Sequence, residues 1–310
     1  MSFRKIFILG AGAIGSCYGA LLSRKNVVTL IGTRAHVNAV NSRGLIINGD
    51  IEGTFQVKAE TRLPGLPANS LIILTTKAQD AVKTAITLKA LLRGDTTFLV
   101  LQNGLQIKEL IQSAIGDRVE VVRGLALMAA EFLEPGKITF WEGSTIIERT
   151  KTGAKIQALF RESGLETRLT ADIKKEEWRK LAVNCVINPL TAILRVRDNE
   201  IYAPSLKEIR RRIVEECSLV AEAEGVLFGH GLAAETDRKI KGYSNYSSMY
   251  QDLAKGKKTE IGFLNEKIVE LGRKHGIGTP VNAALVGLIR FLEAKNCNST
   301  SSGTEKAKKK

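Results

Sequence analysis

The chain contains 310 residues, about twice the length of a typical domain, and carries a net charge of +14. Hydrophobic residues make up 44% of it and charged residues 25%, which excludes disordered and fibrous classes. No apolar run reaches the ~18 residues that a membrane span requires, and the start lacks the features of a secretory signal. We therefore expect a globular, two-domain protein without a membrane partner.

Cysteine usage and charge narrow the class further. The four cysteines lie far apart without a C-x-x-C motif, so neither a metal site nor a disulfide framework is predicted. This pattern fits a reduced, cytoplasmic protein. The positive charge suits either nucleic acid or an anionic small molecule, and composition alone leaves both open.

The first half of the chain alternates strand-like and helical segments. Runs rich in Val, Ile and Leu predict strands at residues 5–9, 27–33, 71–77, 96–101 and 119–132. Amphipathic stretches between these runs predict helices, for example at 13–25 and 79–92. This alternation is typical of a doubly wound α/β fold with parallel strands covered on both faces.

Additional β structure is expected outside that alternation. Residues 44–57 predict an inserted hairpin with its turn at Asn48-Gly49-Asp50. Two short strands are expected within 137–148, and a last strand is expected within 166–173.

The second half of the chain has helical periodicity almost throughout. Helices are expected at about 174–194, 204–228, 233–238, 246–254, 259–275 and 280–294. We therefore predict an α/β domain over 1–170, an all-helical domain over 171–296 and a disordered basic tail over 297–310.

A glycine-rich loop follows the first predicted strand. It matches G-x-G-x-x-G, directly after the strand and at the start of a helix, where free backbone N–H groups can bind phosphates. A merely structural turn is the alternative, but this context favours a Rossmann-type dinucleotide-binding domain. The predicted cofactor-binding residues of the loop are Gly10, Ala11, Gly12, Ala13, Ile14 and Gly15.

The next strand ends bear on the choice of coenzyme. An NAD site usually has an acid after the second strand, but this chain has Arg34 there. A cation suits a 2′-phosphate, so NADPH/NADP is predicted, with NADH as the alternative and a solvated loop charge as the simplest reading of Arg34. Lys77 and Asn103 follow two later strands and are expected to face the same cleft, although a loop lysine and turn chemistry at Asn103 are also common.

Polar residues form a stripe on the helix predicted at 174–194. Lys180, Asn184 and Asn188 recur at i, i+4 and i+8 among apolar residues, so they share one helix face. The amides could bond neighbouring backbone while the lysine extends to solvent. A lysine aligned with two amides is better explained by a face that binds a ligand.

A second stripe is expected around the helix at 246–254. Asn245, Ser248 and Asp252 recur at i, i+3 and i+7, although Asn245 could simply cap the helix. Glu260 precedes the next apolar helix, where an acid also complements the helix N-terminus.

These motifs resemble the ketopantoate reductase (2-dehydropantoate 2-reductase) family. The resemblance rests on KLAVNCVINPLTA, NYSSMYQD, TEIGFLN, the opening GAGAIG and the QNG after a strand, in the same order over nearly the whole chain. It implies a Rossmann domain followed by a helical domain of the 6-phosphogluconate dehydrogenase-like kind. It also implies NADPH-dependent reduction of 2-dehydropantoate to (R)-pantoate, a step toward pantothenate and coenzyme A.

The resemblance also implies residue roles. Lys180 matches the family's proton donor. The expected substrate contacts are Asn103, Lys180, Asn184, Asn188, Asn245 and Ser248. The expected cofactor contacts beyond the glycine loop are Arg34, Lys77, Asn103, Ala130 and Glu260.

The chain departs from its relatives at two positions. Many relatives have Arg directly after the second strand, where this chain has Thr33, with Arg34 one residue later. Asp198 stands in strict register where relatives often have an asparagine that touches substrate, and Asn199 could replace it after a small shift. A carboxylate at 198 would repel an anionic substrate.

Other functions remain open from the sequence. A related two-domain reductase could act on another 2-oxo acid or an opine-type substrate, because pocket shape sets the choice. A nucleotide-sensing or nucleic-acid-binding protein is the competing class, but no nucleic-acid motif accompanies the scattered positive charge. The expected partner is therefore a small 2-oxo acid and not nucleic acid, and homodimerisation is left open.

Overall fold

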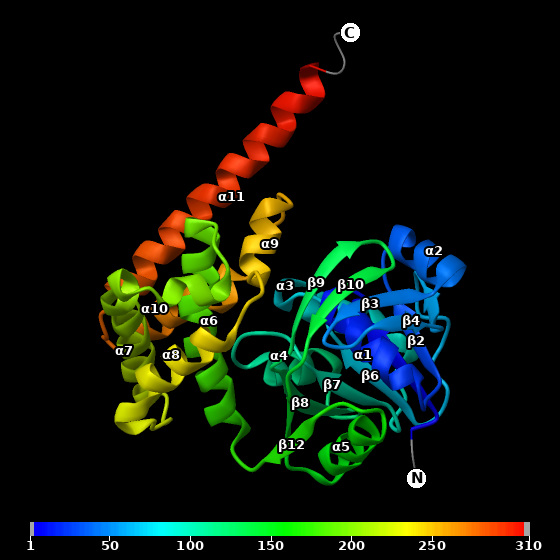
Figure 1. Cartoon of the computed structure of the whole chain (residues 1–310). Helices are drawn as coiled ribbons and strands as arrows, with labels where there is room; N and C mark the ends of the chain where they lie inside the picture. The colour runs from blue at the N-terminus through cyan, green and yellow to red at the C-terminus, as the bar shows by residue number, and fades with distance from the viewer. Residues whose placement is uncertain (1–2, 307–310) are drawn as a thin grey trace. The chain divides into compact units, whose positions relative to one another are not determined.

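The computed structural model describes residues 3–306, without the side chains of residue 230 and residues 297–306. The chain divides into two compact units, Met1–Ile173 and Lys174–Lys310 (Figure 1). The first unit is α/β and the second is helical, so the predicted fold class is confirmed. Among the residues described, no helix is long and apolar enough to cross a membrane.

The first unit is built on an eight-stranded sheet in the order β12-β11-β8-β7-β6-β1-β2-β5. Its strands are β1 (Lys5–Leu9), β2 (Val28–Ile31), β5 (Lys58–Glu60), β6 (Ser70–Leu74), β7 (Thr97–Val100), β8 (Glu120–Ala126), β11 (Thr145–Glu148) and β12 (Thr167–Thr170). All neighbours are parallel except β8 and β11, which run antiparallel. The central strands are apolar because both of their faces are covered; every residue of β6 and of β7 is buried.

A smaller second sheet has the order β4-β3-β10-β9. Its strands are β3 (Leu45–Gly49), β4 (Gly53–Phe55), β9 (Ala129–Glu134) and β10 (Lys137–Trp141). The predicted hairpin is present as β3 and β4, but Asn48 and Gly49 belong to β3. The register pairs Ile47 with Gly53, so the loop lies at residues 50–52, later than predicted.

Five helices connect and cover these strands. They are α1 (Ala13–Ser23), α2 (Arg34–Arg43), α3 (Ala78–Leu88), α4 (Ile107–Ile115) and α5 (Lys151–Glu162). Helix α1 contacts strands of both sheets, and its buried Tyr18 and Leu22 share one core with Leu30 of β2 and Phe140 of β10. This double contact explains why α1 is apolar nearly all round and fixes the loop that precedes it.

The second unit consists of helices with short 3-10 turns between them. The helices are α6 (Ile173–Leu194), α7 (Lys207–Ala223), α8 (Leu232–Gly242), α9 (Ser248–Ala254), α10 (Asn265–Lys274) and α11 (Pro280–Lys306). A buried polar network connects three of them. Asn265 of α10 donates to the carbonyl of Cys185 in α6 (2.9 Å) and to Asn282 of α11 (2.9 Å). Asn265 thus connects α6 and α11 to α10 through one buried side chain.

Helix α11 includes part of the segment that the sequence analysis assigns to a basic tail. Residues 297–306 continue α11 as helical backbone, and residues 307–310 lie outside the described part of the chain.

Candidate functional site

Four neighbouring parallel strands of the first unit end at the same level. The register pairs Leu9 of β1 with Ile31 of β2 and with Leu74 of β6, which in turn pairs with Val100 of β7. The segments that follow these strands carry Arg34, the glycine loop, Lys77 and Asn103. Because adjacent strands lie ~4.8 Å apart, this row of strand ends spans ~14 Å, a length that suits an extended dinucleotide.

The glycine loop has the geometry that a bound pyrophosphate requires. Gly10 has φ +100°, and a Cβ on it would lie 2.5 Å from the backbone nitrogen of Thr76. A Cβ on Gly15 would lie 2.4 Å from the carbonyl oxygen of Gly10, so these two glycines allow strand, loop and helix to pack closely. Gly12 is the N-cap of α1 and makes no side-chain cap bond, and a Cβ on it would meet only the Gly10 carbonyl oxygen, at an ordinary 3.9 Å. The loop therefore fits a phosphate group at the free N–H groups of α1.

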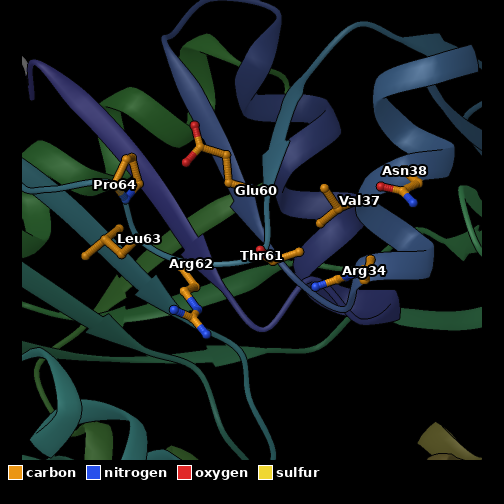
Figure 2. Close-up of a pocket in the computed structure, with 8 residues that line it drawn as sticks. All are labelled: Arg34, Val37, Asn38, Glu60, Thr61, Arg62, Leu63 and Pro64. Carbon is orange, nitrogen blue, oxygen red and sulfur yellow. The ribbon is translucent and has the colours of Figure 1, made fainter.

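A pocket of about 630 Å³ lies beside the ends of β2 and β5. Arg34, the first residue of α2, and Arg62, in the segment after β5, both line it, and Figure 2 shows Thr61 between them. The acid that also lines it, Glu60, is paired with Lys58 at 2.6 Å. The pocket thus has two arginines and a compensated acid, which suits an anionic group.

Arg62 is a candidate that sequence reasoning missed. Its position matters only because β5 pairs with β2 in parallel and brings residue 62 to the end of that strand pair. The three residues of β5 are too few to show a strand pattern in the sequence.

A buried arginine of β8 donates hydrogen bonds to the backbone of the Gln102-Asn103-Gly104 segment. Arg123 is 1% exposed, and its guanidinium donates to the carbonyls of Gln102 (2.9 Å) and Gly104 (3.2 Å), on either side of Asn103. The same group donates to the carbonyls of Val100 (3.0 Å) and Gly124 (2.7 Å). Arg123 therefore positions the backbone around the predicted ligand-binding amide, and no local sequence pattern revealed it.

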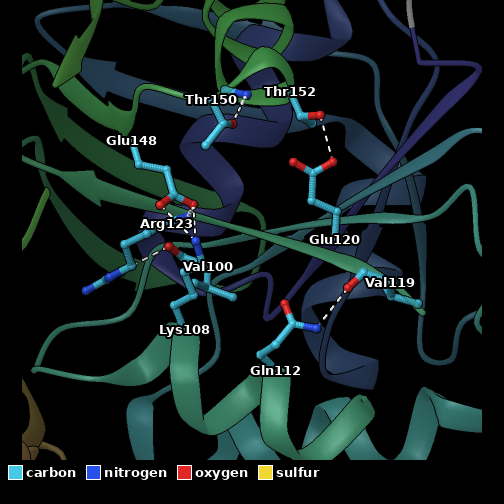
Figure 3. Close-up of polar contacts among 10 residues, drawn as sticks. Val100, Lys108, Gln112, Val119, Glu120, Arg123, Glu148, Thr150 and Thr152 are labelled. Atoms are coloured by element: carbon cyan, nitrogen blue, oxygen red, sulfur yellow. Dashed lines mark hydrogen bonds and ion pairs between the residues drawn. The ribbon is translucent and has the colours of Figure 1, made fainter. Parts of the chain in front are cut away.

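An acid beneath this segment completes the network. Glu148 accepts from the backbone nitrogen of Arg123 (2.8 Å) and from the ammonium of Lys108 (2.7 Å), as Figure 3 shows. The Glu148 carboxylate is nearly buried. Its hydrogen bonds from the Lys108 ammonium and from the Arg123 backbone are both charge-assisted, because the acceptor is ionised. The network thus connects β8, β11 and α4 directly below the strand ends.

The remaining predicted positions of the first unit are placed as follows. Lys77 is the N-cap of α3 and is half-buried, as is Asn103. Ala130 lies in β9 of the smaller sheet, opposite Phe140, and not at the strand ends of the larger sheet.

The lysine–asparagine stripe of the second unit lies on α6. Lys180 and Asn184 are half-buried and Asn188 is 6% exposed, whereas the residues flanking them, such as Leu181 and Cys185, are buried. The helical spacing places the three polar side chains along one face. Lys180 and Asn184 are thus partly removed from water and Asn188 almost completely, which strengthens their electrostatic interactions with a ligand.

The second predicted stripe is not a continuous helix face. Asn245 precedes α9, and the N-cap is Ser247, whose hydroxyl accepts from the backbone nitrogen of Tyr250 (3.1 Å) and from Thr191 of α6 (2.7 Å). Ser248 is the exposed first residue of the helix. Three residues of this segment have cap-forming side chains, so the sequence alone did not identify which one caps.

Asn245 is bonded to Asp198, the acid at the start of the short 3-10 helix Asp198–Tyr202. Its Nδ2 donates to Oδ2 of Asp198 (2.8 Å), and its carbonyl accepts from the backbone nitrogen of Asp198 (3.0 Å). Burial raises the pKa of Asp198 from 3.8 to about 7, against the opposing effects of the Asn245 amide and the Ser247 backbone amide. Glu260, further along the chain, is half-buried and precedes the short 3-10 turn Ile261–Phe263.

Strand ends with a glycine loop, followed by a helical unit with a lysine stripe, define a dinucleotide-dependent enzyme class, and comparisons with known proteins specify it. Residues 6–151 match the family described as Ketopantoate reductase PanE/ApbA, and residues 172–293 match its C-terminal part. The 2-dehydropantoate 2-reductase of Pyrococcus horikoshii is 36% identical over 302 residues, covering 94% of this chain and 98% of that protein. The chain belongs to the ketopantoate reductase family.

Solved structures agree with this assignment. The PanE/ApbA family ketopantoate reductase from Ralstonia eutropha has a TM-score of 0.87 at 31% identity, covering 94% of this chain and 99% of that one. A ternary structure of D-mandelate dehydrogenase with NADH and anilino(oxo)acetate has a TM-score of 0.82 at 28% identity, with the same coverage. The chain is therefore similar in structure to both a ketopantoate reductase and a D-mandelate dehydrogenase.

Proposed function

We propose that the chain is an NADPH-dependent 2-dehydropantoate 2-reductase that forms (R)-pantoate, a step toward pantothenate and coenzyme A. The observation that carries the proposal is the half-buried Lys180 in line with Asn184 and Asn188 on α6. The full-length similarity to proteins named 2-dehydropantoate 2-reductase supports the same substrate.

Lys180 is assigned the role of proton donor. Hydride transfer to a ketone leaves negative charge on the carbonyl oxygen, so the reaction needs a donor aimed at that atom. The Lys180 ammonium can orient the carbonyl and give it the proton. When bound, the reduced nicotinamide coenzyme supplies the hydride.

The remaining polar residues are assigned to binding. Asn184 and Asn188 continue the face of Lys180 and offer neutral hydrogen bonds to the carboxylate and hydroxyl of the substrate, together with Asn103, Asn245 and Ser248. The glycine loop holds the pyrophosphate, and Lys77, Ala130 and Glu260 complete the coenzyme and reaction site. None of these contacts requires a metal ion.

The test of the reaction is NADPH oxidation in the presence of 2-dehydropantoate. Lys180→Ala should lower kcat at least ~100-fold, as expected for loss of a general acid, and should leave NADPH binding unchanged. Lys174→Ala is the matched control, because Lys174 lies on the same helix but is exposed and bonds the carbonyl of Glu224. Near-normal turnover by Lys180→Ala would remove this residue from the mechanism.

The preference for NADPH is assigned to Arg34 and Arg62 at the pocket beside β2. The two guanidiniums would bind the 2′-phosphate, which offsets the displacement of the arginine by Thr33. Arg62→Gln should weaken NADPH binding ~10-fold or more, the loss expected for one charge-assisted hydrogen bond, and should leave NADH binding unchanged. Arg43→Gln is the control, since Arg43 lies at the other end of α2 and bonds the carbonyl of Pro135. Equal effects on both coenzymes would contradict the assignment.

A second candidate substrate follows from the similarity to D-mandelate dehydrogenase. That neighbour, with a TM-score of 0.82, was solved with an aromatic 2-oxo acid derivative, anilino(oxo)acetate. The assay should therefore include an aromatic 2-oxo acid beside 2-dehydropantoate. A higher kcat/KM for the aromatic acid would favour this alternative.

A further inference from the structure

We propose that Asp198 is a specificity-determining residue that makes one corner of the substrate site accept hydrogen bonds only, so that the site selects a 2-oxo acid with a hydroxyl group and rejects one with a second carboxylate. The inference rests on the proposed function, because it takes Asn245 to contact the substrate. It concerns only residues of the helical unit.

The corner is formed by two side chains that are fixed to each other at two points. Asp198 is 3% exposed and Asn245 is 8% exposed. The Asp198 backbone donates to the Asn245 carbonyl at 3.0 Å, and Asn245 Nδ2 donates to Asp198 Oδ2 at 2.8 Å. Nδ2 also donates to the carbonyl of Tyr246 at 3.2 Å, so both of its hydrogens are used.

This pairing leaves the amide oxygen of Asn245 as its available end. Where Asp198 is ionised, the amide cannot turn over, because its oxygen would then face a carboxylate that only accepts hydrogen bonds. Asn245 Oδ1 makes no hydrogen bond within the described residues. It is also not completely buried, so it stays accessible. The end of Asn245 that a ligand can reach is therefore an acceptor.

The second carboxylate oxygen of Asp198 also lacks a hydrogen-bond donor among the described residues. Asp198 Oδ1 is buried and makes no hydrogen bond of normal geometry in the part of the chain described. Burial also raises the pKa of this acid to about 7, so the fold keeps it at a cost in stability instead of a gain. A buried acid that is only half compensated is commonly retained for function.

The chemistry of the Asn245 oxygen sets the ligand, because Asp198 Oδ1 is sealed from the surface and Oδ2 is bonded to Asn245. A hydroxyl group can donate to the Asn245 oxygen, whereas a carboxylate or an ether would bring acceptor against acceptor. Charge on Asp198 adds repulsion against a second carboxylate. An asparagine at residue 198 would lack both effects, since a pair of amides can turn together and offer N–H groups instead.

The test compares three 2-oxo acids that differ only at the terminal carbon. They are 2-dehydropantoate, with CH2OH; 3,3-dimethyl-2-oxobutanoate, with CH3; and 3,3-dimethyl-2-oxobutanedioate, with a carboxylate. Above about pH 8, where Asp198 is ionised, wild-type protein should prefer them in that order. Asp198→Asn should lower the ratio of kcat/KM for 2-dehydropantoate over the dicarboxylate ~10-fold or more, mainly by lowering KM for the dicarboxylate.

The controls separate specificity from folding and from general charge. Glu200→Gln removes the same charge from the same 3-10 turn (Asp198–Tyr202), where the Glu200 side chain only accepts from the Arg197 backbone nitrogen (2.7 Å), and it should leave the ratio unchanged. An unchanged ratio in Asp198→Asn, or equal loss with all three acids, overturns the inference while the proposed function stands. Wild-type protein that reduces none of the three overturns both.

Discussion

The two units each bury one charged side chain next to a predicted ligand-binding amide, but they treat the charge in opposite ways. Arg123, 1% exposed, donates to four carbonyls, two of which flank Asn103. Asp198, 3% exposed, accepts from Asn245 through one oxygen and leaves the other without a partner of normal geometry. A buried charge whose hydrogen bonds are all satisfied, like that of Arg123, stabilises the loop around it. A buried charge that is only partly hydrogen-bonded, like that of Asp198, lowers stability, and we infer that it is retained because it makes the site prefer a hydroxyl group.

Removing the fully bonded charge should have the largest effect on stability. Arg123→Met fills a similar volume but leaves the carbonyls of Val100, Gln102 and Gly104 without their donor. We expect a loss of about 3–5 kcal/mol in the free energy of unfolding, the usual result of breaking a buried polar network. Urea unfolding measures it, with Arg118→Met, an exposed arginine just before β8, as the control. A loss similar to that of the control would contradict the supporting role.

Removing the charge of Asp198 should instead stabilise the protein, and the gain in the free energy of unfolding should depend on pH. The folded-state pKa of Asp198 is about 7, above its usual value of 3.8, so the folded state holds a proton that the unfolded state releases. Stability therefore falls as pH rises between these two values, and the full penalty remains above about pH 7. Asp198→Asn should raise the free energy of unfolding by on the order of 2–4 kcal/mol near pH 8 and by little near pH 4.

Unfolding in urea at the two pH values tests this expectation directly. A more stable variant that is less selective among 2-oxo acids would show that the chain exchanges stability for specificity at this residue. Destabilisation by Asp198→Asn at alkaline pH would instead place Asp198 with Arg123 as a structural support.

A smaller change in stability is expected at Gln102, which is neutral but also buries polar atoms without hydrogen-bond partners among the described residues. Its side chain is 4% exposed, and neither Nε2 nor Oε1 has a hydrogen-bond partner among the described residues, although its carbonyl accepts from Arg123. Gln102→Met keeps the volume and the backbone bond, and we expect a gain of about 1 kcal/mol because a desolvated amide is removed. Thermal unfolding without coenzyme measures it, and a loss of stability would mean that the amide is satisfied in the native protein.

The comparison also explains what the sequence could and could not predict. The glycine loop and the lysine stripe depend on spacing within one segment, so G-x-G-x-x-G after a strand and i, i+4, i+8 on a helix can be read directly. Arg62, Arg123 and Asp198 acquire their surroundings from other segments: β5 beside β2, the loop after β7, and the residue before α9. Strand pairing and side-chain burial are tertiary properties, and no local pattern encodes them.

The smallest effect is expected when the acid-to-amide change is made on the surface. Glu134, at the end of β9, has a side chain that is 57% exposed and lies 3.6 Å from Arg43, which is itself 49% exposed. Glu134→Gln removes the same charge as Asp198→Asn, but water and salt already screen it, so we expect a change below about 0.5 kcal/mol with no slope between pH 5 and 8. Urea unfolding at both pH values is the measurement. If the stability change of Glu134→Gln depends on pH like that of Asp198→Asn, the effect at residue 198 reflects net charge. If the stability change of Glu134→Gln is the same at both pH values, the effect at residue 198 is due to burial.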